Sequence, residues 1–365
     1  MSNLIIGLGN TGTNIVKLAA GSSFLSDAKF YAIDSVASSI DADTLTSVKY
    51  VPIISDEKAG SGRDRTRGAA MFKFHQDNGD FKELYEVAMT SQSPIIVVSS
   101  TAGGTGSGSI VPLCETLIEM KLDVIPILIC PNKLDPAAFH LNTSDLFIEL
   151  GEIGVKTYAT FENKRGDADY RPINNEVVNM IELILGKRFD ATTLDSIDDS
   201  DLDKLLEMPG RIMAVLAESP SIPELAQEIT RKLFVGSQPM WKPETVTGAT
   251  LMTAFSLKSM FADVDFKKVF AEINNRIDPE TIYDNYRNIV KDDNDGVASA
   301  SVIITGLPPV EIKEILGDYK ETRGLGDGIK RSNRPSFIGR KKASTTMTKD
   351  ADGAGPRSKF EWGKD

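Results

Sequence analysis

Glycines, hydroxyl residues and acids gather in short stretches whose spacing suits phosphate chemistry. Gly7, Gly9 and Gly12 stand in the pattern G-x-G-x-x-G, directly after an apolar run. Between a strand and a helix, this pattern lets the backbone approach a phosphate at the helix N-terminus. Asp34 follows at about the distance at which NAD enzymes keep the acid that binds the ribose. Taken alone, the first loop favours a dinucleotide such as NAD.

A second glycine-rich stretch, AGGTGSG at 102–108, also lies between an apolar run and a helical pattern. Its backbone can approach an anion without interference from Cβ atoms, and the following helix directs free N–H groups to the same place. A P-loop would need a lysine, and none occurs between Ser93 and Met120. Two such loops on neighbouring strands favour a nucleoside triphosphate, with Mg²⁺ supplying the missing positive charge.

A third stretch, DSIDDSD at 195–201, is acidic, and Asp198 and Asp201 stand three residues apart within it. A carboxylate can position and partly deprotonate the water that attacks a γ-phosphate. The neighbouring Asp195 and Asp199 leave the choice of the two acids open. A calcium-binding loop that began at Asp195 or at Asp199 would need glycine at its sixth position and glutamate at its twelfth, and neither start satisfies this. A solvated acidic loop is the structural alternative.

The elements that must position these loops alternate between apolar strands and helical patterns over the first 130 residues. This pattern predicts a parallel sheet with helices on both faces, then a long helix that stops at Gly186 and a smaller α+β domain. The expected strands are 3–8, 29–33, 48–53, 94–99, 123–130, a strand near 155–160, 246–258 and 299–305; the expected helices are 12–20, 109–120, 173–185, 264–274, 279–290 and 309–322.

Composition excludes several classes of protein. No apolar run has the roughly 18–20 residues of a membrane helix, and no signal peptide is recognisable at the N-terminus. The chain has only two histidines, His75 and His140, which disfavours a metal site built from histidines and a Ser-His-Asp triad. Cys114 and Cys130 lie in apolar segments, which predicts buried free thiols and a cytoplasmic location.

Charge is divided unevenly along the chain, whose net charge is −11. From Arg323 to the end there are 11 basic and 5 acidic residues, so this part carries +6 and the preceding body −17. A basic tail on an acidic body predicts docking on a neighbouring copy or contact with an acidic partner, and a solvated disordered extension is the alternative.

The second glycine loop also carries a family resemblance. AGGTGSG resembles the GGGTGSG signature loop of the tubulin/FtsZ family of GTP-dependent filament proteins, with Ala102 in place of the first glycine. The match continues in order over roughly residues 3–325. GLGNTGTNIV resembles the family's first phosphate loop, FYAIDSVASSI the second and AGSGRD the third. PNKLDP corresponds loosely to the ribose loop, and asparagines after the next strand and at the start of the long helix resemble the pair that reads guanine.

The resemblance implies a set of residues that bind GTP or GDP with Mg²⁺, the metal being held mainly by phosphates and water. Asn174 is an alternative to Asn175 as a base contact. The implied nucleotide-binding residues are Gly9, Asn10, Thr11, Gly12, Asn14, Asp34, Gly60, Ser61, Gly62, Gly103, Gly104, Thr105, Gly106, Ser107, Gly108, Asp135, Asn163 and Asn175.

The acidic stretch completes the resemblance. In this family the loop after the central helix enters the nucleotide site of the next subunit and activates water there, which implies catalytic roles for Asp198 and Asp201. Ser196 stands where FtsZ has an asparagine, and the following KLLEMPG looks more like the plasmid and phage TubZ branch. VIITGLPPVEIKEIL also looks like the end of the TubZ body.

These observations predict an α/β protein with a parallel-sheet GTPase domain, a long central helix, a smaller α+β second domain, a C-terminal helix and a disordered basic tail. The expected parts are a GTP-binding domain at 1–171, the central helix at 172–186, the catalytic acidic loop at 187–203, the α+β activation domain at 204–308, the C-terminal helix at 309–322 and the basic tail at 323–365.

The function expected from the resemblance is GTP hydrolysis coupled to head-to-tail assembly into cytoplasmic filaments. Such filaments would segregate plasmid or phage DNA through a DNA-binding adaptor protein, and we expect no membrane contact and no direct contact with nucleic acid. The alternatives are an FtsZ-like cell-division or phage-spindle tubulin, a filament that does not hydrolyse GTP, and an NAD-dependent oxidoreductase. Phe360 and Trp362 in the tail form a docking motif or are there by chance.

Overall fold

The structure is a computed structural model of the chain. It describes residues 2–36, 47–54, 60–132, 134–163, 170–189, 196–238, 245–246, 248–292 and 296–310. The expected helix at 309–322, apart from its first two residues, and the basic tail with Phe360 and Trp362 lie outside these ranges, as does Asp195.

A single sheet of ten strands runs through the described part of the chain, in the order β3-β2-β1-β4-β5-β6-β7-β10-β8-β9. The strands from β3 to β7 are parallel, as the sequence predicted, and β10 pairs antiparallel with both β7 and β8. The strands are β1 (Asn3–Leu8), β2 (Lys29–Asp34), β3 (Val48–Pro52), β4 (Gln92–Ser100), β5 (Val124–Cys130), β6 (Thr157–Glu162), β7 (Gly210–Ser219), β8 (Leu251–Ser259), β9 (Ile282–Lys291) and β10 (Ala298–Leu307).

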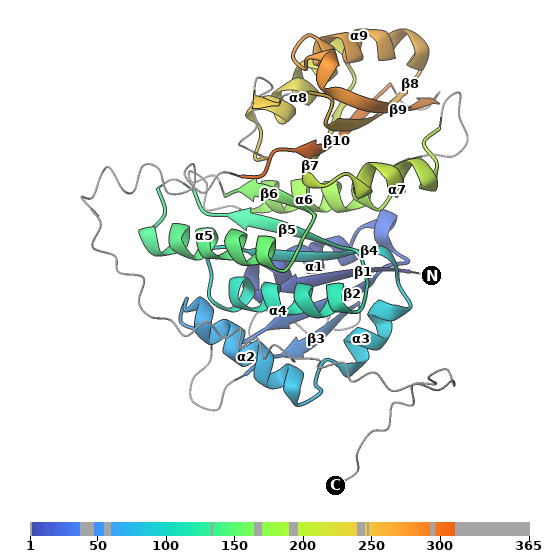
Figure 1. The fold of residues 1–365 in the computed structure, drawn as a ribbon. Coiled ribbons are helices and arrows are strands. Elements are labelled where there is room, and N and C mark those ends of the chain that lie inside the picture. Colours follow the sequence, from blue (N-terminus) through green and yellow to red (C-terminus); the bar gives the residue numbers. More distant parts are fainter. Residues whose placement is uncertain are drawn as a thin grey trace, which may run out of the picture.

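Helices cover both faces of this sheet (Figure 1). They are α1 (Gly9–Ala20), α2 (Arg65–Asp77), α3 (Lys82–Met89), α4 (Thr105–Glu119), α5 (Ala137–Glu152), α6 (Arg171–Ile184), α7 (Asp199–Glu207), α8 (Ile222–Val235) and α9 (Ala262–Asn274), with short 3-10 turns at Ser23–Leu25 and Pro279–Thr281. The α/β fold class predicted from the sequence is confirmed. The predicted domain boundaries stay a prediction.

Alternate residues of the strands enter different cores, which explains the continuous apolar runs in the sequence. In β1, Ile5 belongs to a core that also contains residues of α1, α6 and α7, whereas Leu4 and Ile6 belong to a core with residues of α2, α3, α4 and α5. A third core lies between the second half of the sheet and helices α8 and α9. The core around α6 contains residues from β2 through to β8, so it joins the two halves of the sheet.

Several sequence expectations differ from the structure, among them the strand predicted at 246–258, which begins only at Leu251. The helix predicted at 279–290 is wrong, because these residues form a 3-10 turn and edge strand β9. Ile282, Tyr286 and Ile289 fit a helical spacing. The buried residues of β9 are the consecutive Asn288, Ile289 and Val290, so the strand lacks the alternation of buried and exposed residues that would have revealed it. Strand β7 and helix α8 were not predicted, and residues 199–203 of the expected acidic loop belong to α7.

Both cysteines are free and buried, as predicted, and burial raises the pKa of each thiol to about 12. Helix α6 ends where expected, since Gly186 has a φ of +69°, the left-handed region that favours glycine.

Buried charge anchors the end of α6. Glu182, whose side chain is 3% exposed, pairs with Arg188 at 2.5 Å and accepts a hydrogen bond from Ser22, which follows α1. The Arg188 guanidinium also lies 3.7 Å from the centre of the Phe24 ring. These contacts hold the C-terminal end of α6 against the segment after α1, at the edge of the sheet where the parallel strands begin.

We expect Arg188→Ala to lower the free energy of unfolding by about 3 kcal/mol, because it leaves a buried carboxylate without its cation. Lys187→Ala is the matched control: its partner Asp27 is 54% exposed, so we expect a loss below about 1 kcal/mol. Urea unfolding followed by circular dichroism measures both variants. Equal losses would contradict the role given to the Glu182 pair.

Candidate functional site

The loops that follow the parallel strands lie at one edge of the sheet, the place where α/β folds bind ligands. Every residue predicted to bind nucleotide is at the end of one of these strands, in the loop after it, or in the first turns of the helix that follows. They come after β1 (Gly9, Asn10, Thr11, Gly12 and Asn14), at the end of β2 (Asp34), before α2 (Gly60, Ser61 and Gly62), after β4 (Gly103 to Gly108), after β5 (Asp135), and after β6 with the start of α6 (Asn163, Asn174 and Asn175).

The two glycine-rich stretches meet backbone to backbone. A Cβ on Gly9 would lie 2.9 Å from the amide nitrogen of Gly106, and a Cβ on Gly106 would lie 2.7 Å from the carbonyl oxygen of Leu8. Gly9 also has a φ of +65°. Glycine is therefore required at both positions, and the starts of α1 and α4 lie side by side.

Both helices begin earlier than predicted. Helix α1 begins at Gly9 rather than at residue 12, and α4 begins at Thr105 rather than at residue 109. Thr105, Gly106 and Ser107 are therefore in the first helical turn, where backbone N–H groups have no carbonyl partner within the helix. This correction increases the number of amides that can face an anion at this edge.

Gly103 differs from the glycines around it, because a Cβ built on it would meet nothing within 4 Å. A Cβ on Gly104 would lie 2.7 Å from the amide nitrogen of Asp64, and one on Gly108 would lie 2.6 Å from that of Ala69. Gly104 and Gly108 are thus required by packing against α2 and the segment before it. Packing does not require glycine at Gly103, which borders open space beside the first turn of α4.

Three hydroxyl groups from three loops form a buried cluster. The Thr105 hydroxyl oxygen lies 2.8 Å from that of Ser35 and 3.0 Å from that of Ser61. All three residues are at most 9% exposed. Ser61 and Thr105 were predicted site residues, whereas Ser35 was missed; its signal was its place directly after Asp34.

Asp34 is also buried at this edge. One carboxylate oxygen accepts a hydrogen bond from the Ser35 N–H at 2.7 Å, and the Tyr50 hydroxyl donates to the Asp34 carbonyl at 3.0 Å. Burial raises the pKa of Asp34 above its usual range, although the hydrogen bonds from Ser35 and Val36 oppose this. Asp34 and the adjacent hydroxyls are oxygen donors of the kind that Mg²⁺ prefers. Among the described residues, no group of three or more His, Cys, Asp or Glu side chains is placed to hold a metal ion.

Neighbouring helices fix the loop after β4. The Arg65 guanidinium forms a bidentate pair with Glu149 at 2.6 and 2.5 Å and donates to the carbonyl of Ser107 at 3.1 Å. The Asn142 side chain donates to the carbonyl of Ala102 at 3.0 Å. Sequence reasoning missed these supporting residues, because each lies far along the chain from the loop that it holds.

The predicted base and ribose contacts lie at the ends of β5 and β6. The carboxylate of Asp135 accepts from the N–H of Asn132 at 2.8 Å, which closes a tight turn after β5. The Asn163 N–H donates to the carbonyl of Cys130 at 2.9 Å. Asn174 is half-buried and Asn175 is exposed on the first turns of α6.

Asp198 and Asp201 do not lie with these loops. Helix α6 starts beside the end of β6 and carries the chain to the opposite edge of the sheet, a span of roughly 20 Å for its 14 residues. There the Thr157 hydroxyl, at the start of β6, donates to the carbonyl of Leu206 at 3.5 Å. Figure 1 accordingly shows α7 on the side where the chain begins. The two acids therefore cannot complete the glycine-loop site of their own chain.

The spacing of the two acids has a structural cause of its own. Asp198 caps α7 by accepting from the N–H of Asp201 at 2.8 Å, and Asp201 accepts in return from the N–H of Asp198 at 3.4 Å. This reciprocal capping box requires acceptors three residues apart. Asp198 is nevertheless exposed, and so is Asp199 beside it. Burial, followed by the hydrogen bond and negative charge of Asp284 and then by the charges of Asp201 and Asp198, raises the pKa of Tyr286 on β9 to about 12.

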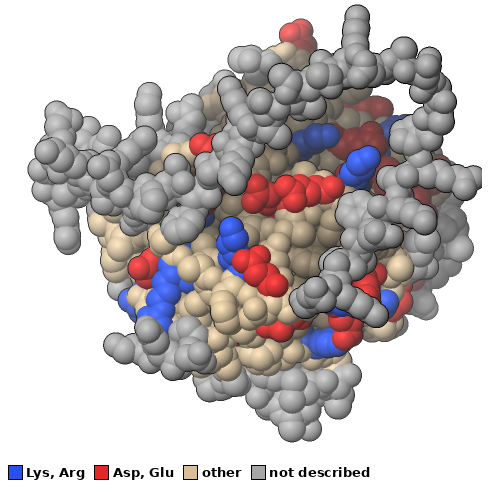
Figure 2. All heavy atoms as spheres, turned by 60° about the horizontal axis from the view of Figure 1, so that its bottom comes forward, with Lys and Arg blue, Asp and Glu red and all other residues tan. Residues whose placement is uncertain are grey.

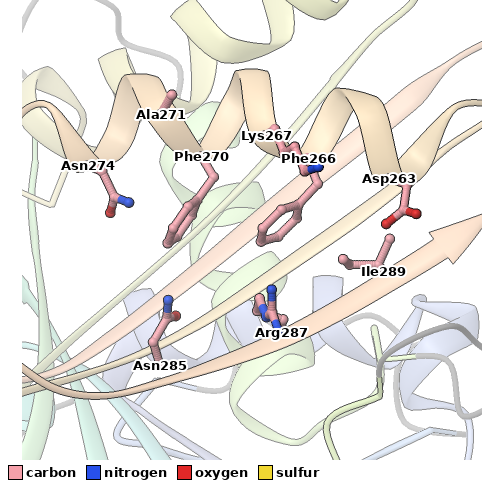
Figure 3. A pocket seen from close by; sticks show the side chains of 9 residues that line it. All are labelled: Asp263, Phe266, Lys267, Phe270, Ala271, Asn274, Asn285, Arg287 and Ile289. Atoms are coloured by element: carbon pink, nitrogen blue, oxygen red, sulfur yellow. The ribbon is translucent and has the colours of Figure 1, made fainter.

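Of two further surfaces on the described part of the molecule, one shows no concentration of acids and the other contains none of the predicted site residues. On the face in Figure 2, basic and acidic side chains are interspersed, so no single acidic patch stands out there. A groove of about 560 Å³ lies between α9 and β9, where Phe266 and Phe270 point toward Asn285, Arg287 and Ile289 (Figure 3). No predicted site residue lines this groove.

Neither a protein-family model nor a curated protein sequence matches this chain. Solved structures do. CetZ2 from Haloferax volcanii, described as a GTPγS-bound protofilament, is 17% identical with a TM-score of 0.67 over 88% of this chain and 98% of that one. A GTPγS-form protofilament of TubZ from Bacillus thuringiensis serovar israelensis is 18% identical, with a TM-score of 0.66 over 88% and 92% of the two chains. An FtsZ dimer from M. jannaschii is 17% identical, with a TM-score of 0.63 over 84% and 88%.

These structural neighbours are proteins of the tubulin/FtsZ family, and at such low identity the likeness shows the fold alone. The chain has the tubulin/FtsZ fold, as its motifs predicted. CetZ, FtsZ and TubZ are all among the neighbours, so the TubZ branch stays a prediction. Within the described residues, no helix combines the length and apolar character needed to cross a membrane.

We expect Gly106→Ala to lower the free energy of unfolding by about 1–3 kcal/mol, because its Cβ would lie 2.6 Å from the Ser99 hydroxyl and 2.7 Å from the Leu8 carbonyl. Gly103→Ala, with nothing within 4 Å of its Cβ, should leave stability within about 0.5 kcal/mol of the wild type. Thermal unfolding of the two variants measures the difference. Equal stability of the two variants would show that the glycine loops do not meet as described.

Proposed function

We propose that this chain binds GTP at the glycine-loop edge of the sheet. The observation that carries the proposal is the meeting of the starts of α1 and α4 at Gly9 and Gly106, with Gly103 bordering open space beside them. Two helix N-termini side by side direct backbone amides and the positive ends of two dipoles at one anionic group. A triphosphate is long enough to occupy both helix N-termini. The CetZ2 and TubZ neighbours are described with GTPγS.

Each loop then has a role. Gly9, Asn10, Thr11 and Gly12 with residues 103–108 hold the phosphates, together with Asn14 on the first turns of α1. Gly60, Ser61 and Gly62 contact the terminal phosphate. Asp135 binds the ribose, while Asn163 and Asn175, or Asn174 in its place, read guanine.

Mg²⁺ fits the oxygen donors that this edge provides, namely Asp34, Ser35 and Thr105. When bound, it offsets the negative charge that develops on the phosphates during hydrolysis. Ser35 and Ser61 keep the Thr105 hydroxyl in place through their hydrogen bonds.

Hydrolysis of this GTP requires a second copy of the chain. The acids of α7 lie at the opposite edge from the glycine loops, so a head-to-tail contact brings Asp198 and Asp201 of one copy to the nucleotide of the next. There a carboxylate positions the attacking water and accepts its proton. The CetZ2 and TubZ neighbours are described as protofilaments, which supports such an assembly.

The biological role that we propose is segregation or positioning of plasmid or phage DNA by these filaments, in the cytoplasm and through a DNA-binding adaptor protein. The resemblance of 196–210 and of the end of the body to TubZ supports it. A cell-division or phage-spindle tubulin is the second candidate, since FtsZ is also among the structural neighbours. A nicotinamide dinucleotide would use Gly9 and Asp34 but would leave the loop after β4 without a role.

The experiment that tests this function is GTP hydrolysis measured against protein concentration, with light scattering read in the same cuvette. For the wild type we expect turnover only above the concentration at which scattering rises. Asp201→Asn and Asp198→Asn should assemble but lose at least about 100-fold in turnover, because asparagine keeps the capping contacts of α7 but cannot accept the proton.

Glu207→Gln, at the other end of α7, is the matched control and should hydrolyse GTP as the wild type does. Turnover that is independent of protein concentration, or full activity of both asparagine variants, would overturn the proposal.

A further inference from the structure

Residues 237 and 238 lie where β6 and β7 separate. The two strands pair only from Thr157–Gly210 to Ala159–Ile212. Beyond this point, the backbone of Ala214 on β7 is hydrogen-bonded by the side chain of Gln238, whose amide oxygen accepts at 3.1 Å and whose amide nitrogen donates at 2.6 Å. Gln238 thereby takes the place that β6 would occupy beside β7.

Ser237 makes two contacts on the other side of this gap. Its carbonyl accepts from the N–H of Glu162, the last residue of β6, at 2.7 Å. Its hydroxyl donates to the carboxylate of Glu176 on α6. Ser237 and Gln238 are 8% and 6% exposed, so water competes little for these bonds.

The two partners of Ser237 are the chain neighbours of the proposed guanine contacts. Glu162 precedes Asn163, and Glu176 follows Asn175. One residue therefore holds the end of β6 and the first turns of α6 in a fixed relation. The spacing between two side chains that read one base depends on this relation.

We propose that Ser237 is a positioning residue for recognition of the guanine base. The inference rests on the proposed function, since it needs the base to lie between Asn163 and α6. Ser237 touches no nucleotide itself. It acts through Glu162 and Glu176, and it belongs to the connection after α8, so it links the base end of the site to the second half of the sheet.

Ser237→Ala tests the inference because it removes only the hydroxyl contact with Glu176, while the carbonyl that holds Glu162 remains. The measured quantity is the ratio of the dissociation constants for ITP and GTP, which differ in the 2-amino group of the base. We expect GTP affinity to fall by about tenfold, since one hydrogen bond to a carboxylate is lost, and the ratio to fall toward one. Ser237→Thr keeps a hydroxyl and should restore the ratio.

A double-mutant cycle gives the second readout. Ser237→Ala and Glu176→Ala should each reduce the ratio, and the double variant should reduce it no further than Glu176→Ala alone, because the contact between Ser237 and Glu176 is already lost there. Gln238→Ala is the matched control: it removes the bonds to Ala214, so it should lower the unfolding temperature and leave the ratio unchanged.

If Ser237→Ala fails to fold, Glu176→Gln, which keeps the side-chain shape, should still reduce the ratio at least about twofold.

The outcomes separate the inference from the function on which it rests. A wild-type protein that binds no GTP, or binds GTP and ITP equally, overturns the proposed guanine site. A wild-type preference for GTP that survives unchanged in Ser237→Ala overturns the role of Ser237 alone. A ratio that falls equally in Gln238→Ala would show a general loosening and would also overturn it.

Discussion

The close approach of two backbone segments, at Gly9 and Gly106, is the constraint on which the candidate site depends. It requires that neither position carries a Cβ, and it places the first turns of α1 and α4 against each other. Other contacts support this arrangement from outside: Arg65 with Glu149 and Ser107, Asn142 with Ala102, and the hydroxyls of Ser35 and Ser61 with Thr105. A rigid scaffold of this kind holds amides in place before an anion arrives, so binding does not have to order them.

Helix α6 provides the second constraint. It begins at the edge where the proposed nucleotide lies and ends at the opposite edge, where Glu182 anchors it to Ser22 and Arg188. Its length separates the glycine loops from Asp198 and Asp201. Under the proposed function, one copy of the chain therefore holds two incomplete halves of a hydrolytic site. The proposed function therefore makes GTP hydrolysis depend on assembly of the chains.

The sequence predicted the parallel half of the fold well, because strands buried on both faces are continuous apolar runs and glycine loops mark their ends. It failed at β9, an edge strand whose apolar residues happen to fit a helical spacing. It could place the glycines but not separate their roles: Gly106 is required by packing, whereas Gly103 borders open space. Ser237 carried no signal, since its partners Glu162 and Glu176 are 75 and 61 positions away in the chain. Spacing alone also left the pair Asp198 and Asp201 ambiguous, and the structure adds a capping role to the proposed catalytic one.

The central claim is that two copies of the chain share one hydrolytic site, and a mixing experiment tests it most directly. Gly103→Val fills the open space at the phosphate loops, and Asp201→Asn removes a proposed catalytic carboxylate while keeping the cap of α7. Each variant alone should be inactive in GTP hydrolysis. An equimolar mixture should recover about a quarter of wild-type activity. When the two variants follow one another in random order in a head-to-tail array, an intact nucleotide site meets intact acids at about one in four contacts. A mixture as inactive as its components, although both variants enter the same filaments, would contradict the account.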